Sequence, residues 1–167
     1  MKIKLGIILF AMSFLGCIMA PPPEGGIKKI YLKPFGNQTV EYSLHTELFK
    51  LVQSEFLRDS YIELVSEDQA EYKVSGVISG YDLRPISYSM QNYVESFEMI
   101  IKVKLTLDDL LESEVVFQET FETNEIYFTK EGNPNETLSN TQLEAETQED
   151  AIDLLARDIT RKIVYAK

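Results

Sequence analysis

The chain has 167 residues, of which 44% are hydrophobic, and a formal net charge of −11 from 16 basic and 27 acidic residues. This length suits one domain with a substantial core. The acidic balance argues against nonspecific binding of nucleic acids, because such binding depends on positive charge that meets phosphates.

The first twenty residues contain the longest apolar run of the chain and its only cysteine, Cys17. Lys2 and Lys4 precede the run, which is slightly shorter than the roughly 20 residues that a membrane-spanning helix needs. A charged start and a short apolar middle are typical of a secretory signal peptide. The letters FLGC at 14–17 resemble the lipobox of bacterial lipoproteins, although Phe14 stands where leucine is usual. In such proteins the chain is cut before the cysteine, which carries the lipid.

We therefore expect residues 1–16 to be a lipoprotein signal peptide, residues 17–26 to be the lipidated cysteine and a flexible tether, and residues 27–167 to form one domain. The tether is rich in proline and glycine, which favour extended and flexible backbone. Ile18 replaces the aspartate that retains enteric lipoproteins at the inner membrane, which favours the inner, periplasmic leaflet of the outer membrane. An ordinary signal peptide with an unmodified cysteine and an uncleaved anchor helix are the alternatives.

The first half of the remaining chain predicts a strand, a helix and a second strand. Residues 27–32 form the first strand, and Pro34 and Gly36 break it. Residues 43–59 predict a helix, and residues 61–65 predict a short strand. The helix has one apolar stripe at helical spacing, made of Leu44, Leu48, Leu51, Val52 and Phe56.

The second half predicts three longer strands and a final helix. Residues 72–81 favour a strand, with Gly76 and Gly80 placed for a bulge or strong twist. Residues 97–107 carry apolar side chains at every odd position and mostly polar ones, apart from Ile100, at even positions, which predicts a strand with one buried face, and residues 115–128 predict a further strand. A polar loop is expected over 130–150. The final helix is predicted from the apolar positions Ile152, Leu155, Ala156, Ile159 and Ile163.

This β-α-β-β-β-α order predicts an α+β fold, with two amphipathic helices on one face of a mostly antiparallel or mixed sheet of four to five strands. A sheet built on hairpins can leave its other face in water. Lys102 and Lys104 share that polar face, about 7 Å apart, and Lys73 lies on a predicted neighbouring strand. These three lysines are the candidate ligand-binding residues for the phosphates of an anionic lipid. A solvated face that balances nearby acids is the alternative.

The sequence offers little catalytic chemistry. It has one histidine, His45, and no nucleophile elbow, P-loop or dinucleotide-binding motif. His45 lacks the further nitrogen or sulfur ligands that a zinc site uses. We therefore expect no catalytic residue, no metal and no cofactor, and a binding or assembly protein rather than an enzyme.

Five short motifs follow one another along the chain. They are FLGC at 14–17, F-x-N-x-T at 35–39, FLRD at 56–59, G-x-I-x-x-Y at 76–81 and A-x-x-x-L-A-x-x-I at 151–159. In this order they resemble the LptE family of lipopolysaccharide-assembly lipoproteins, across nearly all of the chain that follows the signal peptide.

The resemblance implies a non-enzymatic lipoprotein that plugs the lumen of a large outer-membrane β-barrel, LptD. It also implies help with folding of the barrel and with insertion of lipopolysaccharide into the outer leaflet. The expected partners are an LptD-like barrel, the membrane through the lipid anchor, and lipopolysaccharide. Family members credited with lipopolysaccharide contact use basic residues, whereas this chain is strongly acidic. The turn at 34–39 is also similar to lipoproteins that regulate peptidoglycan synthases and to a curli-secretion group, which gives the alternative functions.

A Cys17→Ala variant tests the lipid anchor. We expect this variant to leave the membrane fraction and to keep its fold, because the tether is predicted to lie outside the domain. Cell fractionation and the intact mass of the mature wild-type protein provide the measurements. Recovery of the variant from membranes as a full-length precursor would mean that the apolar segment itself anchors the chain.

Overall fold

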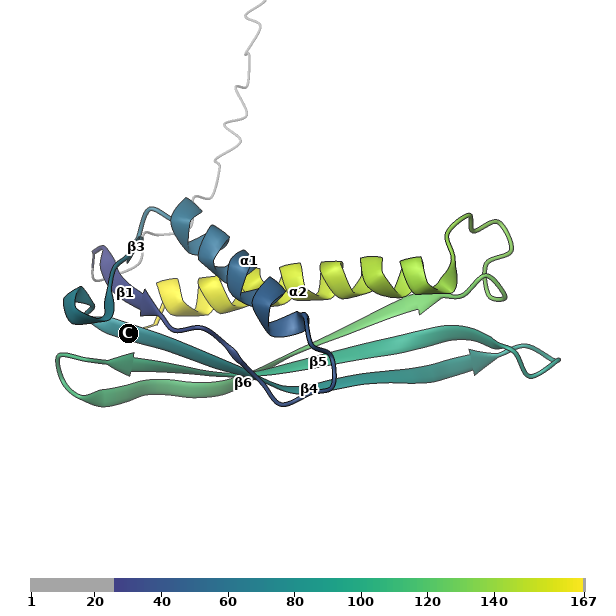
Figure 1. The fold of residues 1–167 in the computed structure, drawn as a ribbon, viewed down its shortest axis with the longest axis horizontal. Coiled ribbons are helices and arrows are strands. Elements are labelled where there is room, and N and C mark those ends of the chain that lie inside the picture. The colour runs from purple at the N-terminus through teal and green to yellow at the C-terminus, as the bar shows by residue number, and fades with distance from the viewer. Residues whose placement is uncertain (1–25, 167) are drawn as a thin grey trace, which may run out of the picture.

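The structure is a computed structural model that describes residues 26–166. The predicted signal peptide, Cys17 and the tether up to residue 25 lie outside the described residues. A long sheet lies beneath two helices (Figure 1). The elements are β1 (Lys28–Leu32), β2 (Gly36–Asn37), α1 (Leu44–Arg58), β3 (Ile62–Leu64), a 3₁₀ turn (Glu67–Gln69), β4 (Tyr72–Tyr88), β5 (Val94–Asp109), β6 (Glu114–Phe128) and α2 (Asn140–Val164).

The sheet is mixed, with the strand order β3-β1-β4-β5-β6, and β2 pairs with β4 beside this path. β1 and β2 are parallel to β4, and β1 is parallel to β3, whereas β4, β5 and β6 form an antiparallel meander. The predicted α+β class is confirmed. The sheet has six strands rather than four to five, because Gly36 and Asn37 resume pairing opposite Val77 and Ile78 after the break at Pro34.

One face of β5 forms the centre of the core. Met99, Ile101, Val103 and Leu105 are fully buried, as the alternation predicts, and Ile100 on the other face is buried as well, at 5% exposure. The predicted bulge in β4 is present as a register shift between Ile78 and Gly80. The apolar stripes of both helices are buried in the same core, apart from partly buried Leu51: Leu44, Leu48, Val52 and Phe56 in α1, and Ile152, Leu155, Ala156, Ile159 and Ile163 in α2.

The start of α2 differs from the sequence prediction. The expected polar loop over 130–150 ends at Ser139, and the helix begins at Asn140. A capping box starts it: the Ser139 side chain accepts a hydrogen bond from the Gln142 N–H, and the Gln142 side chain accepts one from the Ser139 N–H. The first turns carry no apolar stripe because they extend beyond the part of α2 that packs into the core.

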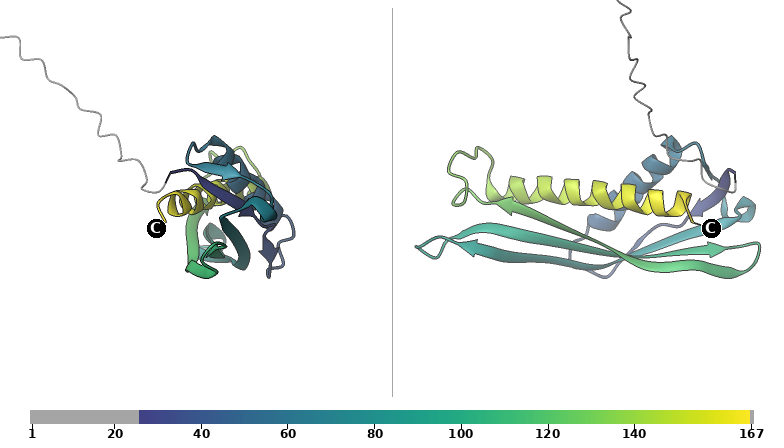
Figure 2. Two further views of the ribbon diagram at one scale, coloured as in Figure 1. Left: turned by 90° about the vertical axis from the view of Figure 1, so that its left-hand side faces the viewer. Right: turned by 180° about the vertical axis from the view of Figure 1, so that it is seen from behind.

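Both helices lie on the same side of the sheet, and the view from behind in Figure 2 shows the same arrangement. β1 and the end of α2 lie at one end of the molecule, and the β4–β5 turn lies at the other (Figure 1). We call these the basal and distal ends.

A buried lysine joins β1 to the end of α2. Lys28 is 8% exposed, and its Nζ donates hydrogen bonds to the carbonyls of Ile163 at 2.8 Å, Val164 at 3.2 Å and Ala166 at 2.6 Å. Burial lowers the pKa of Lys28, while the negative end of the helix dipole favours the ammonium form. The last carbonyls of a helix lack hydrogen-bond donors within the helix. The Lys28 ammonium donates to three of the carbonyls at the end of α2 in their place.

A Lys28→Met variant tests this contact. Methionine keeps an apolar stem but leaves the carbonyls without their donor, so we expect the free energy of unfolding to fall by about 2 kcal/mol. Urea unfolding followed by circular dichroism measures it. Lys29→Met is the matched control, since Lys29 is exposed on the same strand. An equal loss in both variants would contradict a specific role for Lys28.

Candidate functional site

The open face of the sheet, opposite the helices, contains the three lysines singled out from the sequence. Lys102 and Lys104 occupy even positions of β5, which point away from the buried odd positions. Lys73 in β4 lies opposite Asp108, another even position of β5. The predicted shared face is therefore correct for Lys102 and Lys104, and Lys73 lies on the same face in the neighbouring strand β4.

Neighbouring acids pair with two of these lysines. The Lys102 Nζ lies 2.8 Å from a Glu122 oxygen in β6, and the Lys73 Nζ lies 3.9 Å from an Asp108 oxygen. Exposed pairs of this kind contribute about 0–1 kcal/mol each. Their main effect here is that the acids neutralise the positive charge of Lys73 and Lys102, which would otherwise attract an anionic ligand.

Lys104 differs because it has no carboxylate within 4.0 Å in the part of the chain that the structure describes. It lines a pocket of about 310 Å³ on the open face, together with Gln38, Ser75, Thr106 and Gln118. The Gln118 side chain donates to the Thr106 hydroxyl at 3.1 Å. One ammonium beside hydroxyl and amide groups can hold a single anionic group. We call Lys73, Lys102 and Lys104 the lysine row. Because two of the three are paired with acids, the lysine row offers less positive charge than three unpaired lysines would.

The distal end of the open face is apolar. Ile126 is 54% exposed and Phe128 is 57% exposed, and both lie on this face because they pair with Glu98 and Ser96. Tyr88, Met90 and Tyr93, at the β4–β5 turn at the same end of the sheet, are also exposed. We call these five residues the distal apolar patch: Tyr88, Met90, Tyr93, Ile126 and Phe128.

This patch is not among the surfaces predicted from the sequence. A signal was present, because Ile126, Tyr127 and Phe128 are three consecutive apolar residues that follow four polar residues at 122–125. Apolar side chains on both faces of a strand indicate that both faces are covered. In the structure only Tyr127 is buried, where its ring stacks on Phe97 at 5.5 Å between centroids.

Within residues 26–166, no group of three or more histidine, cysteine or acidic side chains could hold a metal ion. No helix in the same range has both the length and the apolar composition needed to cross a membrane.

The comparisons with known proteins agree with this description of the fold. A protein of Xanthomonas campestris matches with a TM-score of 0.64 at 12% identity, over 86% of this chain and 87% of that one. A hypothetical protein of Chlamydia trachomatis gives 0.61 at 10% identity, over 84% and 98%. The rare lipoprotein B of Shewanella oneidensis gives 0.58 at 14% identity, over 81% and 93%. These similarities concern the fold alone.

No curated protein matches the sequence. The family described as LptE, lipopolysaccharide-assembly, matches over residues 27–166, which is nearly the whole of the described chain. The matched range includes four of the five short motifs, at 35–39, 56–59, 76–81 and 151–159, but not the lipobox at 14–17. The chain therefore belongs to the LptE family, whose members are non-enzymatic lipopolysaccharide-assembly lipoproteins of the cell envelope.

Proposed function

We propose that this chain joins an LptD-like outer-membrane β-barrel, helps the barrel assemble and plugs its lumen during insertion of lipopolysaccharide into the outer leaflet. Cys17 would hold the domain at the inner, periplasmic leaflet through its lipid. Membership of the LptE family supports this role. An acidic plug suits a lumen lined with complementary charge.

The distal apolar patch is the observation that carries the proposal. Large apolar side chains that gather at an exposed end mark an interaction surface. β4 has 17 residues, and at about 3.3 Å per residue it spans roughly 55 Å. The patch therefore lies far from the basal end, where the anchor joins the domain. A plug that starts at the inner leaflet needs this reach, since a bilayer with its headgroups is about 40–45 Å thick.

Purification from outer membranes in mild detergent tests the partner. We expect a large β-barrel at one-to-one stoichiometry with the wild-type protein. An Ile126→Asp/Phe128→Asp variant should recover about tenfold less barrel, because buried charges opposite an apolar surface cost more than 1.4 kcal/mol. Both positions are exposed, so the isolated domain should keep its fold.

Leu111→Asp is the matched control, because Leu111 is 71% exposed in the β5–β6 turn at the basal end. It should recover as much barrel as the wild type. Recovery of a penicillin-binding protein in place of a barrel would contradict the proposed function and favour a regulator of peptidoglycan synthesis. Equal loss in the two variants would contradict the role of the distal apolar patch.

The ligand-binding role of Lys73, Lys102 and Lys104 stays a prediction, and Lys104 tests it best because its ammonium is free of ion pairs among the described residues. We expect Lys104→Gln to weaken cosedimentation with vesicles that contain diphosphorylated lipid A by about threefold, the scale of one exposed ion pair. Lys130→Gln, at another exposed lysine, is the control. No difference between the two variants would remove the lysine row from lipid recognition.

A further inference from the structure

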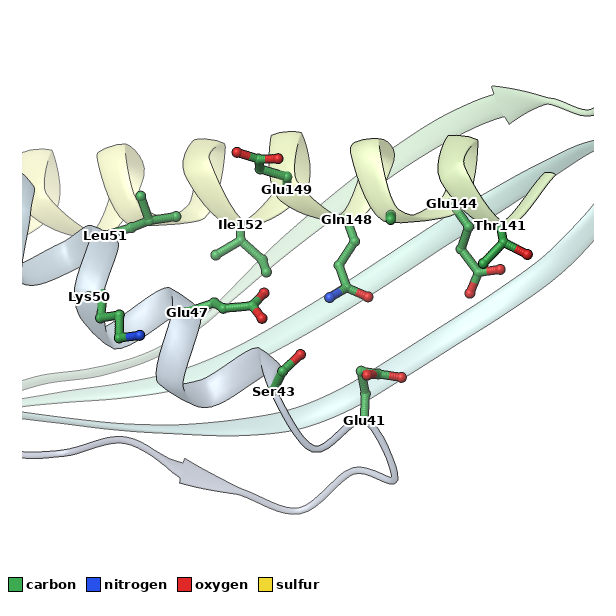
Figure 3. A pocket seen from close by; sticks show the side chains of 11 residues that line it. Glu41, Ser43, Glu47, Lys50, Leu51, Thr141, Glu144, Gln148, Glu149 and Ile152 are labelled. Carbon is green, nitrogen blue, oxygen red and sulfur yellow. The ribbon is translucent and has the colours of Figure 1, made fainter. Parts of the chain in front are cut away.

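A groove of about 690 Å³ lies on the helix side of the molecule, away from the surfaces described above. The groove lies between the first half of α2 and the start of α1 with the loop that precedes α1. Side chains from both helices point into the groove (Figure 3). Its volume is in the range of binding clefts, roughly 300–1,000 Å³. Its main lining side chains are Glu41, Glu47, Leu51, Glu144, Glu149 and Ile152.

The groove has a negative rim. Four of its lining residues are glutamates, and one, Lys50, is basic. None of the four forms an ion pair among the residues that the structure describes, and only Glu144 accepts a side-chain hydrogen bond, from Tyr81 at 3.3 Å. The start of α1 adds about half a positive charge. The sum remains negative, so a cation would be attracted and an anion repelled.

The base of the groove is apolar. Ile152 belongs to the core and is 1% exposed, and Leu51 packs against the same core while only partly buried. Ala145 adds a small exposed side chain on α2. An apolar base beneath an acidic rim matches side chains with an aliphatic stem and a cationic head, which are those of lysine and arginine.

The rim carboxylates are spread along the groove. They form no cluster that could hold a metal ion, so a single inorganic cation is a poor match. Glu144 and Glu149 are five residues apart in α2, which places them about 7.5 Å apart along the helix axis and about 140° apart around it. The rim carboxylates therefore need separate cationic side chains. An extended segment with several basic residues can supply them.

Contacts at both sides hold the groove in place. The Asn37 side-chain amide donates to the Glu41 carbonyl at 2.7 Å, and the Thr39 N–H and hydroxyl both donate to the Asn37 side-chain oxygen. On the other side, Tyr81 donates to Glu144. Burial and the nearby Glu144 raise the pKa of Tyr81, so its hydroxyl keeps the proton that it donates. A site held in this way loses less entropy on binding.

We propose that the groove between α1 and α2 binds an extended basic segment of a partner protein. Its lysine or arginine side chains pair with Glu47, Glu144 and Glu149, and their aliphatic stems rest on Leu51 and Ile152. Charge complementarity selects this occupant over an acidic or purely apolar one. The inference rests on the groove alone and does not require that the partner be the barrel.

Binding of a fluorescent peptide with alternating lysine and valine residues to the full mature chain tests this inference. We expect a Glu47→Gln/Glu149→Gln variant to bind about tenfold more weakly, which corresponds to about 1.4 kcal/mol. The affinity of the wild type should fall as salt is raised, since the pairs are partly exposed. Ala145→Arg should abolish binding, because it places a bulky cation in the groove.

A Glu67→Gln/Glu112→Gln variant is the matched control, since both glutamates are exposed and outside the groove. It removes the same charge and should bind within about twofold of the wild type. Equal weakening in both double variants would assign binding to the overall acidity and overturn the proposal. Unchanged binding by Ala145→Arg would also overturn it.

Barrel copurification with the Glu47→Gln/Glu149→Gln variant separates the two proposals. If the peptide loses affinity while the barrel is still recovered, the groove binds another basic segment and the proposed function is unaffected. If wild type recovers the barrel but never binds the peptide, the groove proposal fails by itself. If the wild type binds the peptide but recovers no barrel, the groove proposal holds and the proposed function fails.

Discussion

Burial of one face of β5 beneath both helices is the constraint on which the rest of the structure depends. The antiparallel β4–β5–β6 meander has two faces, and the helices cover only one of them. Burial is the main driving force of folding, so the apolar residues at odd positions of β5 fix which face turns toward the helices. The same choice places Lys102 and Lys104 on the open face, and strand pairing then places Ile126 and Phe128 on it as well.

Periodicity in the sequence was sufficient to predict the fold class, the core face of β5 and both helix stripes, because each signal lies within about fifteen consecutive residues. It failed where the cause is polar or distant. The start of α2 depends on the reciprocal bonds of Ser139 and Gln142, which leave no apolar pattern. β2 exists because Gly36 meets Val77, some forty residues later in the chain.

The open face shows the same division between local and distant information. The alternation of side chains along β5 was enough to place Lys102 and Lys104 on one face. Whether each lysine is paired with an acid depends on strand register. Glu122 reaches Lys102 only because β6 pairs with β5 in this register. Lys104, two residues further along, lies opposite Thr120 and is left with hydroxyl and amide neighbours. Composition alone treats these two lysines as equivalent.

The motifs that carry the family resemblance serve mainly as structural contacts beside the groove. Phe35 packs on Gly76, where an added Cβ would meet the ring at 3.0 Å, so a larger residue at that position would displace the Phe35 ring. Asn37 then positions Glu41, and Tyr81 holds Glu144. Two acids about a hundred residues apart in the chain therefore line one groove. The open face compensates two of its three lysines, whereas the groove leaves its acids uncompensated. Contacts at the distal apolar patch should therefore tolerate salt, and contacts in the groove should not.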